Sequence, residues 1–296
     1  MAVMVNHPTY FYGTVLVFGL IIGSFLNVVI HRLPIMMEKD WVCECREYLA
    51  KELVDKKPAE ETEPQVYNLS VPRSACPKCG HKITALENIP IISWLVLRGK
   101  CSGCANPISI RYPLVELLTG ALSLAVAINW GPTQVTLLYL VLTWGLIALT
   151  FIDFDTMLLP DEITLPLLWL GLLVAVWGLG IPPTDAIVGA CVGYLSLWSV
   201  YWGFKLATGK EGMGYGDFKL MAVFGAWLGW QSVFLILLLS SFVGAIFVIA
   251  ILYAQKKGKN TQVPFGPYIA IAGWIALLWG DSMIEFYLQN YFYQAV

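Results

Sequence analysis

The sequence predicts an all-α polytopic membrane protein with about eight transmembrane helices and a cytoplasmic four-cysteine element between the first and second helices. Of the 296 residues, 58% are hydrophobic and only 13% are charged, whereas soluble domains carry roughly 25% charged residues. The hydrophobic residues form separate runs of membrane-crossing length. Four cysteines lie in two C-x-x-C pairs inside the longest polar segment.

Eight apolar runs are the expected transmembrane helices, with ends defined to about 2–4 residues. Crossing the hydrocarbon core takes about 20 apolar residues, and the run at 218–230 is shorter than the others. The eight runs cover residues 11–30, 113–130, 134–152, 164–181, 185–206, 218–230, 232–254 and 267–288.

Lysine and arginine lie in three blocks along the chain. Twelve fall between Arg32 and Arg111, three follow the fifth run and three follow the seventh. Loops rich in lysine and arginine stay in the cytoplasm. With eight crossings, all three basic blocks lie in the cytoplasm and both termini lie on the other side of the membrane. The chain then divides into a first helix (1–30), a cytoplasmic segment (31–112) and a seven-helix membrane domain (113–296). Within the segment, the charged stretch at 51–65 reads as a solvated loop.

The two cysteine pairs are Cys76 and Cys79 in "CPKC", and Cys101 and Cys104 in "CSGC". Two such pairs supply the four thiolates of a tetrahedral zinc site, and a redox dithiol is the alternative. Because sulfur fills every position, the metal is expected to be structural. A further pair, Cys43 and Cys45, has no additional metal-binding residues around it, so it is only weak evidence for a second metal site.

Two loops place acidic residues at the edge of an apolar run. The first loop, "FIDFDTMLLPDEIT" at 151–164, contains Asp153, Asp155 and Asp161. The second, "GYGD" at 214–217, ends in Asp217. Under the predicted topology both loops face the cytoplasm at the membrane boundary, so two carboxylates can meet at the same depth.

A close pair of carboxylates supports peptide hydrolysis without a metal or a serine. Since neighbouring like charges do not both ionise readily, one carboxylate holds a proton while the other acts as a base. The base takes a proton from water, the water attacks a carbonyl carbon, and the acid donates to the carbonyl oxygen. We expect Gly214 and Gly216 to adopt backbone angles closed to other residues, bringing the substrate close and placing Asp217.

Each aspartate also has a simpler interpretation. Asp217 and Asp161 fit helix N-caps, where aspartate favours the helix dipole. Asp153 and Asp155 fit ordinary interfacial charges. A phosphate-binding loop around Gly214 is disfavoured, because no Gly-Lys-Ser or Gly-Lys-Thr follows.

Taken together, the motifs resemble the type IV prepilin peptidase family, bacterial membrane aspartic proteases of the GxGD type. The resemblance covers nearly the whole chain and includes "CPKC" and "CSGC". The other matching stretches are "GSFLNVVIHRLP" (23–34), "ENIPIISWLVLRGKC" (87–101), "RYPLVELLTG" (111–120), "DFDTMLLPD" (153–161) and "GYGD" (214–217).

The resemblance implies an activity and a location. Such enzymes act in the bacterial inner membrane and cut the basic leader of type IV prepilins and pseudopilins after a glycine, on the cytoplasmic side. Many then methylate the new amino terminus with S-adenosylmethionine. By motif, Asp153 and Asp217 match the catalytic aspartates, and Asp155 and Asp161 take supporting roles. The expected partners are these substrates and membrane lipid, not nucleic acid.

The methyltransferase part is harder to locate in the sequence. No strand followed by G-x-G-x-x-G marks a soluble nucleotide fold, so we expect this site in the cytoplasmic segment and the membrane mouth. Gly99 and Lys100, beside Cys101, are the candidates, although Gly99 also suits a simple turn into the zinc element.

Three other functions remain open from the sequence. One is a peptidase without methyltransferase activity. Another is a membrane assembly protein that docks through its zinc element and tolerates loss of either aspartate. A transporter is disfavoured, because its carboxylates should lie near the membrane midplane, whereas these lie at the expected cytoplasmic ends.

Overall fold

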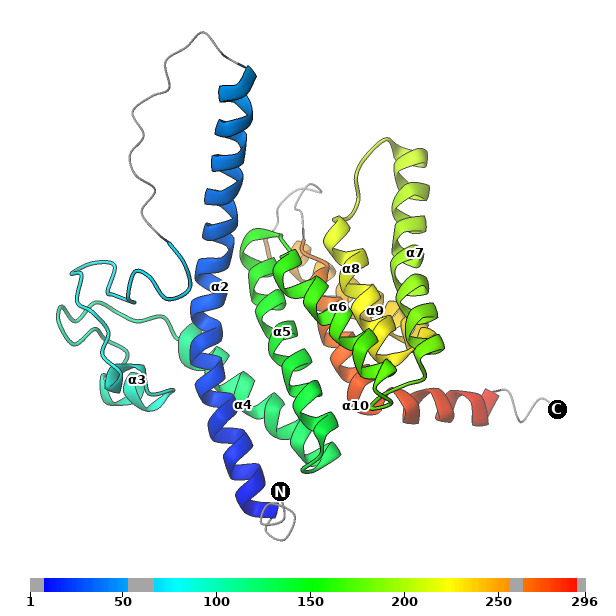
Figure 1. The fold of residues 1–296 in the computed structure, drawn as a ribbon, viewed down its shortest axis with the longest axis horizontal. Helices are drawn as coiled ribbons and strands as arrows, with labels where there is room; N and C mark the ends of the chain where they lie inside the picture. The colour runs from blue at the N-terminus through cyan, green and yellow to red at the C-terminus, as the bar shows by residue number, and fades with distance from the viewer. Residues whose placement is uncertain (1–7, 53–66, 256–262, 292–296) are drawn as a thin grey trace. The chain divides into compact units, whose positions relative to one another are not determined.

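The computed structural model describes residues 8–52, 67–255 and 263–291 (Figure 1). Within these ranges the chain is helical, and the only β pairing is two isolated bridges, Ala75 with Lys82 and Lys100 with Pro107. The predicted all-α class is therefore confirmed. The helices are α2 (Pro8–Glu52), η1 (Leu86–Asn88), α3 (Ile92–Val96), α4 (Arg111–Trp130), α5 (Gln134–Thr156), α6 (Asp161–Val176), α7 (Pro183–Thr208), α8 (Tyr215–Leu228), α9 (Trp230–Gln255) and α10 (Gly266–Tyr291).

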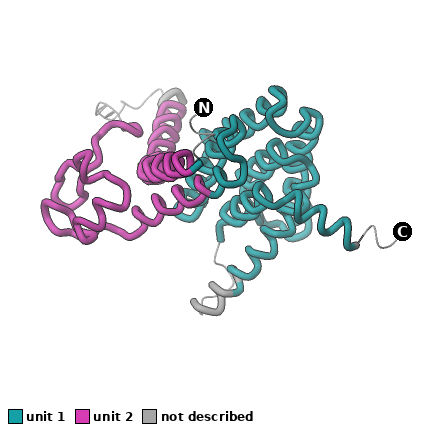
Figure 2. The backbone as a smooth tube through the Cα atoms, turned by 90° about the horizontal axis from the view of Figure 1, so that it is seen from below, with its two compact units in different colours: residues 1–8, 125–296 teal, residues 9–124 magenta. Residues whose placement is uncertain are grey.

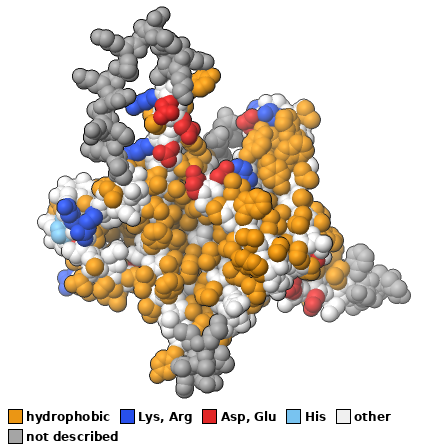
Figure 3. All heavy atoms as spheres, viewed as in Figure 1, with side chains coloured by type: hydrophobic (Ala, Val, Ile, Leu, Met, Phe, Trp, Pro, Cys, Tyr) orange, Lys and Arg blue, Asp and Glu red, His pale blue; other side chains and the backbone are white. Residues whose placement is uncertain are grey.

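Each of the eight expected membrane runs coincides with a helix, but not every helix has membrane-crossing length. Six are long and apolar enough to cross a bilayer, namely α2, α4, α5, α7, α9 and α10. The helices α6, with 16 residues, and α8, with 14 residues, fall short of the roughly 20 that a crossing needs. The count of eight crossings is thus not confirmed. Hydrophobic side chains cover most of the described surface seen in Figure 3.

The helix α2 continues far past the predicted first crossing at residues 11–30. Its 45 residues correspond to about 67 Å at 1.5 Å per residue, roughly twice the thickness of the hydrocarbon core. The second half of α2 carries the charged sequence from Glu38 to Glu52. Lys51 and Glu52 of the expected solvated loop end this helix, and residues 53–66 lie outside the described part of the chain.

The chain divides into two compact units, which are described separately (Figure 2). Residues 9–124 form the first unit, which contains most of α2, the cysteine pairs and the first turns of α4. Here α2 and α4 approach closely, because a methyl group on Gly23 would lie 2.7 Å from the Cα atom of Glu116. The second unit comprises residues 1–8 and 125–296 and contains both aspartate loops.

The core of the second unit surrounds α8, which contacts α6, α7, α9 and α10. Nearly every residue of α8 from Asp217 to Trp227 is buried, as expected for a helix that is hydrophobic on all sides. The indole of Trp227 donates a hydrogen bond of 2.8 Å to the carbonyl oxygen of Leu167 on α6. Protein side chains rather than lipid therefore surround α8.

Glycine residues bring α7 and α8 into direct backbone contact. A methyl group on Gly189 of α7 would collide with the carbonyl group of Gly225 on α8, and a methyl group on Gly225 would collide with the carbonyl of Gly189. Small residues allow such close approach between membrane helices. Because α8 carries Asp217, this contact fixes the position of one aspartate loop.

Substituting Gly189 by alanine should destabilise the protein by about 1–3 kcal/mol or more, since the added methyl has no space beside the α8 backbone. The measurement is thermal unfolding of the purified protein in detergent. Gly203 on the same helix is the matched control, because a methyl group there meets nothing within 4 Å. Gly203→Ala should leave stability unchanged or raise it slightly, and equal effects of the two substitutions would contradict the packing argument.

Candidate active site and metal centre

Asp153 lies in the last full turn of α5 and is only 4% exposed. The residue after the helix, Met157, adopts a left-handed conformation with φ 56° and donates its backbone N–H to the carbonyl oxygen of Asp153 at 2.9 Å. The chain then runs through Leu159 and Pro160 into α6. In the described part of the chain, Asp153 Oδ2 is a buried side-chain oxygen without a hydrogen-bond partner.

Asp217 lies in the first turn of α8 and is 6% exposed. The N-cap of α8 is Gly214, not Asp217, and Pro160 rather than Asp161 is the N-cap of α6. Both aspartates lie in the first turn of their helix, Asp161 at its first residue and Asp217 at its third. Neither aspartate is therefore the N-cap residue itself, although both lie where the helix dipole favours a negative charge. Asp217 is also buried, which a solvent-exposed helix end does not require.

Leu159 and Gly266 bring the two aspartate loops together. A methyl group on Gly216, beside Asp217, would lie 2.7 Å from Leu159 Cβ. A methyl group on Gly266, at the start of α10, would lie 3.1 Å from Leu159 Cδ1 and 2.6 Å from Asp153 Oδ2. Leu159 thus contacts the residue before Asp217 and also Gly266, which lies against Asp153. The starts of α8 and α10 and the end of α5 therefore form a single buried acidic site.

The glycines of the GYGD motif act differently from our expectation. Gly214 has φ −82°, and Gly216 is not among the residues with positive φ, so neither needs a backbone conformation reserved for glycine. Glycine is required at residue 216 instead because Leu159 leaves no space for a side chain there. Sequence reasoning also missed Gly266, whose only signal was a glycine between two prolines, "PFGP", at the start of an apolar run.

An ion pair joins the first turns of α6 and α8. Lys219 Nζ lies 2.7 Å from both carboxylate oxygens of Asp161, and both side chains are partly exposed. Asp161 follows the loop that carries Leu159, and Lys219 follows Asp217 by two residues. The pair therefore connects the two aspartate motifs. Asp155, in the last turn of α5, has an exposed side chain.

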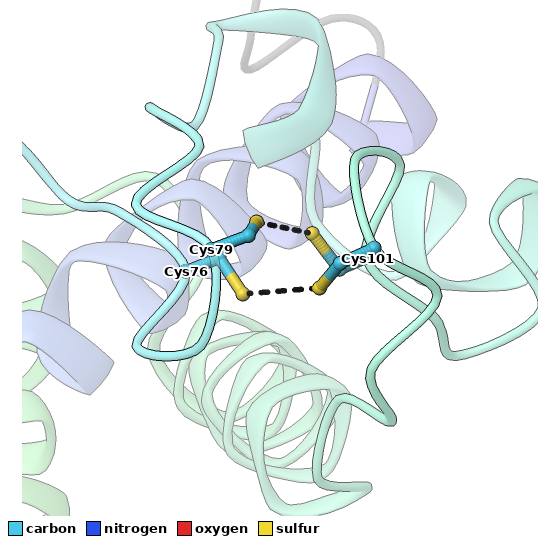
Figure 4. Close-up of side chains that lie close together, drawn as sticks. Cys76, Cys79 and Cys101 are labelled. Atoms are coloured by element: carbon cyan, nitrogen blue, oxygen red, sulfur yellow. Dashed lines mark hydrogen bonds between the residues drawn. The ribbon is translucent and has the colours of Figure 1, made fainter.

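The four predicted cysteines converge in the first unit (Figure 4). The Sγ atoms of Cys76 and Cys104 are 3.8 Å apart, those of Cys79 and Cys101 are 3.9 Å apart, and all four lie within 4.8 Å of one another. A tetrahedral metal with metal–sulfur bonds of about 2.3 Å would hold its sulfurs about 3.8 Å apart. The cluster fits one metal ion, whereas a disulfide needs about 2.05 Å between its sulfurs.

The two cysteine loops share one backbone geometry. In each loop the first cysteine donates its N–H to the carbonyl five residues later, from Cys76 to His81 and from Cys101 to Asn106. It also accepts from the N–H four residues later, that of Gly80 or Ala105. Both of these residues have positive φ, 71° for Gly80 and 55° for Ala105. The second loop therefore holds an alanine where the first has glycine.

Glu87 connects the two cysteine loops through hydrogen bonds. Its Oε1 lies 3.1 Å from His81 Nε2 beside the first loop and accepts from the hydroxyl of Ser102 inside the second. Its Oε2 accepts from the backbone N–H of Thr84 at 2.8 Å. The bonds from Ser102 and Thr84 lower the pKa of Glu87 to about 2, so this carboxylate is ionised at neutral pH.

The geometry at Gly99 and Lys100 is that of a turn into the second cysteine loop. Gly99 has φ 66°, and a methyl group there would lie 2.9 Å from Cζ2 of Trp94. Trp94 donates its indole N–H to the carbonyl of Ile108 at 3.2 Å. Lys100 is exposed. Cys43 and Cys45 are exposed on α2 and belong to no cluster of metal-binding side chains among the described residues.

Two family comparisons cover most of the chain. Residues 17–130 match the family described as "Bacterial Peptidase A24 N-terminal domain", and residues 140–249 match the "Type IV leader peptidase family". A protein of Aeromonas hydrophila named "Prepilin leader peptidase/N-methyltransferase" is 59% identical over 286 residues, which cover 96% of each chain. A protein of Pseudomonas aeruginosa with the same name is 54% identical over 97% of this chain and 96% of its own.

The chain belongs to the type IV leader peptidase family. The matched ranges correspond to the two sites, because residues 17–130 contain the cysteine cluster and residues 140–249 contain both buried aspartates. Gly266 lies beyond the matched range of the peptidase family although it contacts Asp153. No solved structure matches the chain.

Reversing one charge of the Asp161–Lys219 pair should destabilise this leader peptidase by about 0.5–1 kcal/mol, because like charges then face each other across a partly exposed contact. Thermal unfolding of Asp161→Lys, Lys219→Asp and the double variant measures the effect. The double variant, with the charges exchanged, should recover most of the loss. Additive losses in the double variant would show that the ion pair does not join the loops.

Replacing Gly80 by alanine should open the first cysteine loop more readily. The left-handed conformation costs alanine about 1–2 kcal/mol, and the added methyl meets nothing within 4 Å, so only the backbone changes. The rate at which a thiol reagent modifies the cluster measures the opening. Ala105→Gly is the reverse experiment and should slow modification. Unchanged rates in both variants would refute the shared loop geometry.

Proposed function

We propose that this protein removes the basic leader of type IV prepilins and pseudopilins after a glycine, with Asp153 and Asp217 as the catalytic pair, and then methylates the new amino terminus. The named relatives, which align over almost the whole chain, support both activities. The observation that carries the peptidase part is that Asp153 and Asp217, from separate helices, are both buried and that their loops meet at Leu159.

The geometry suits an attack by water on a peptide carbonyl. Two buried carboxylates in electrostatic contact share one proton. The ionised carboxylate takes a proton from water, the water oxygen bonds to the carbonyl carbon, and the protonated partner donates to the carbonyl oxygen. Breakdown of the tetrahedral intermediate then returns a proton to the leaving amine.

The location of the pair suits a substrate that is half in the membrane. Asp153 lies near the end of α5, a helix of membrane-crossing length. In the proposed arrangement the active site faces the cytoplasm of the inner membrane and both termini lie outside, as the basic blocks indicate. The basic leader then stays in the cytoplasm, the apolar pilin helix lies in lipid beside the enzyme, and the bond to be cut lies between them.

Zinc is the metal that we propose for Cys76, Cys79, Cys101 and Cys104. Four thiolates with tetrahedral spacing favour zinc over harder cations that prefer oxygen ligands. All four positions are sulfur, so this metal would stabilise the fold instead of activating water. The metal would hold together the two ends of the segment from residue 76 to residue 104, and this segment includes Glu87.

Methyl transfer would use S-adenosylmethionine, which supplies an electrophilic methyl group when bound. The relatives' name, prepilin leader peptidase/N-methyltransferase, supports this second activity. Gly99 and Lys100 remain the candidate residues for the methyltransferase site. At the peptidase site, supporting roles are proposed for four residues: Asp155, Asp161, Gly214 and Gly216. The chain would recognise its prepilins through a basic leader and an apolar helix, not through nucleic acid.

Asp153→Asn and Asp217→Asn should each lower leader cleavage by a factor of about 1,000 or more, because either change removes one half of a catalytic unit. Membranes containing each variant are incubated with a prepilin and S-adenosylmethionine, and the pilin is weighed by mass spectrometry. The wild type should give a pilin without its leader that carries one added methyl group.

Asp281→Asn is the matched control, since Asp281 is an exposed aspartate in the second half of α10, and this variant should cleave normally. Cleavage that survives both Asp153→Asn and Asp217→Asn would refute the proposed pair. Leader loss without the methyl group would leave a peptidase only.

A further inference from the structure

Glu116 is a buried carboxylate that the peptidase mechanism does not use. It lies in the second turn of α4 and is 8% exposed. Its Oε2 accepts a hydrogen bond of 2.7 Å from the backbone N–H of Ile91, and the hydroxyl of Ser24 on α2 lies beside it. In the part of the chain that the structure describes, no basic side chain forms an ion pair with Glu116.

The nearby hydrogen bonds of α2 come from polar, uncharged side chains. Ser24 Oγ lies 3.3 Å from Asn88 Oδ1, and Asn27 donates to the carbonyl oxygen of Tyr112 at 3.1 Å. Arg32, the buried cation of α2, donates instead to the carbonyl oxygens of Asn68 and Leu69. The negative charge of Glu116 is therefore not balanced by this group of side chains.

A buried ionisable group in a membrane helix is costly and usually serves a function. The backbone of Ile91, which donates to Glu116, has φ 61° and ψ −48°, a strained conformation for a β-branched residue. Such strain gathers at functional sites. Since Asn88 is exposed, the polar group around Glu116 reaches the surface at that residue.

The segment that Glu116 anchors presents an apolar surface. Along η1 and α3, several large hydrophobic side chains are exposed: Leu86, Ile92, Leu95 and Val96. In a membrane protein, exposed apolar side chains contact lipid or a bound apolar partner. A ligand with a positive charge at one end and an apolar body could bind Glu116 through its charge and the exposed side chains of η1 and α3 through its apolar body.

We propose that Glu116 binds the new α-ammonium group of the cleaved pilin and accepts its proton during methyl transfer, with the exposed apolar side chains of residues 86–96 holding the pilin's apolar helix. The inference rests on the proposed function, because leader cleavage creates this cation at the start of an apolar helix. Ser24, Asn27 and Asn88 supply the surrounding polar groups.

The chemistry needs a base near the amine. An α-ammonium group loses its proton only near pH 8, so at neutral pH it reaches the site charged. Glu116 takes that proton. The nitrogen lone pair then forms a bond to the methyl carbon of S-adenosylmethionine, while the sulfur–carbon bond breaks and its electron pair stays on sulfur. The products are the methylated amine and S-adenosylhomocysteine.

The decisive variant is Glu116→Gln. Glutamine keeps a carbonyl oxygen that accepts from the N–H of Ile91, so the anchor of this segment is retained while the charge is removed. The probe is a synthetic peptide with a free amino terminus that continues with the apolar sequence of a mature pilin. Its affinity is compared with that of the same peptide carrying an acetylated amino terminus, in detergent and without S-adenosylmethionine.

The wild type should bind the free amine about tenfold or more tightly than the acetylated peptide, as a hydrogen bond to a charged group predicts. Glu116→Gln should bind both peptides equally, cleave a prepilin normally and release it without the methyl group. Asp217→Asn, which removes a carboxylate from the peptidase site, should keep the preference for the free amine.

Three results would overturn the proposal. One is a Glu116→Gln variant that still methylates and still prefers the free amine. Another is a preference that disappears in Asp217→Asn instead, which would assign the amine to the peptidase pair. The third is a Glu116→Gln protein that loses stability and cleavage together, which would make Glu116 a structural anchor. If the wild type cleaves without methylating, the proposed function itself is corrected and this inference fails with it.

Discussion

The contact between Gly189 and Gly225 is the constraint on which the buried aspartate site depends. It brings the backbones of α7 and α8 together at a distance that no side chain permits. A helix of 14 residues has too few apolar residues to cross a bilayer alone, so α8 is held by the helices around it. Because those helices fix α8, they also fix Asp217 in its first turn, next to Leu159 and the loop that follows Asp153.

The same principle, close backbone contact followed by a few polar bonds, operates in the first unit. Gly23 lets α2 approach α4 at Glu116, and Glu116 in turn holds the N–H of Ile91. The segment from Ile91 leads to Cys101, and Glu87 joins the two cysteine loops at its other end. A metal in the cysteine cluster and the carboxylate of Glu116 would thus fix the same segment from two sides.

The sequence was sufficient where a local pattern determines the structure. The two C-x-x-C pairs come together as their spacing indicated, and the eight apolar runs are eight helices. The sequence already showed the α8 run to be short, but it did not show that α6 has only 16 residues. Protein surrounds most of α8, whereas Trp169, Leu173 and Val176 of α6 are exposed. The length of α2 was also missed, because its charged second half continues the helix although it no longer suits the membrane.

The errors at the aspartate site come from tertiary contacts. Gly216 was expected to adopt an unusual backbone angle, but it is required by the space that Leu159 occupies, and Leu159 is 57 positions earlier in the sequence. Gly266 was missed because its role exists only when α10 begins beside Asp153. The buried polar group at Glu116 was likewise hidden, since its members come from three separate stretches that the sequence shows only as motifs.

The central claim is that Asp153 and Asp217 act as one unit, and a kinetic double-mutant cycle tests it most directly. Single-turnover cleavage of a purified prepilin is measured for the wild type, Asp153→Asn, Asp217→Asn and the double variant. If the two carboxylates act together in one catalytic step, the cleavage rate of the double variant should be no lower than that of the slower single variant. Losses that multiply in the double variant would show that the two aspartates act independently, and the proposed pair would be wrong.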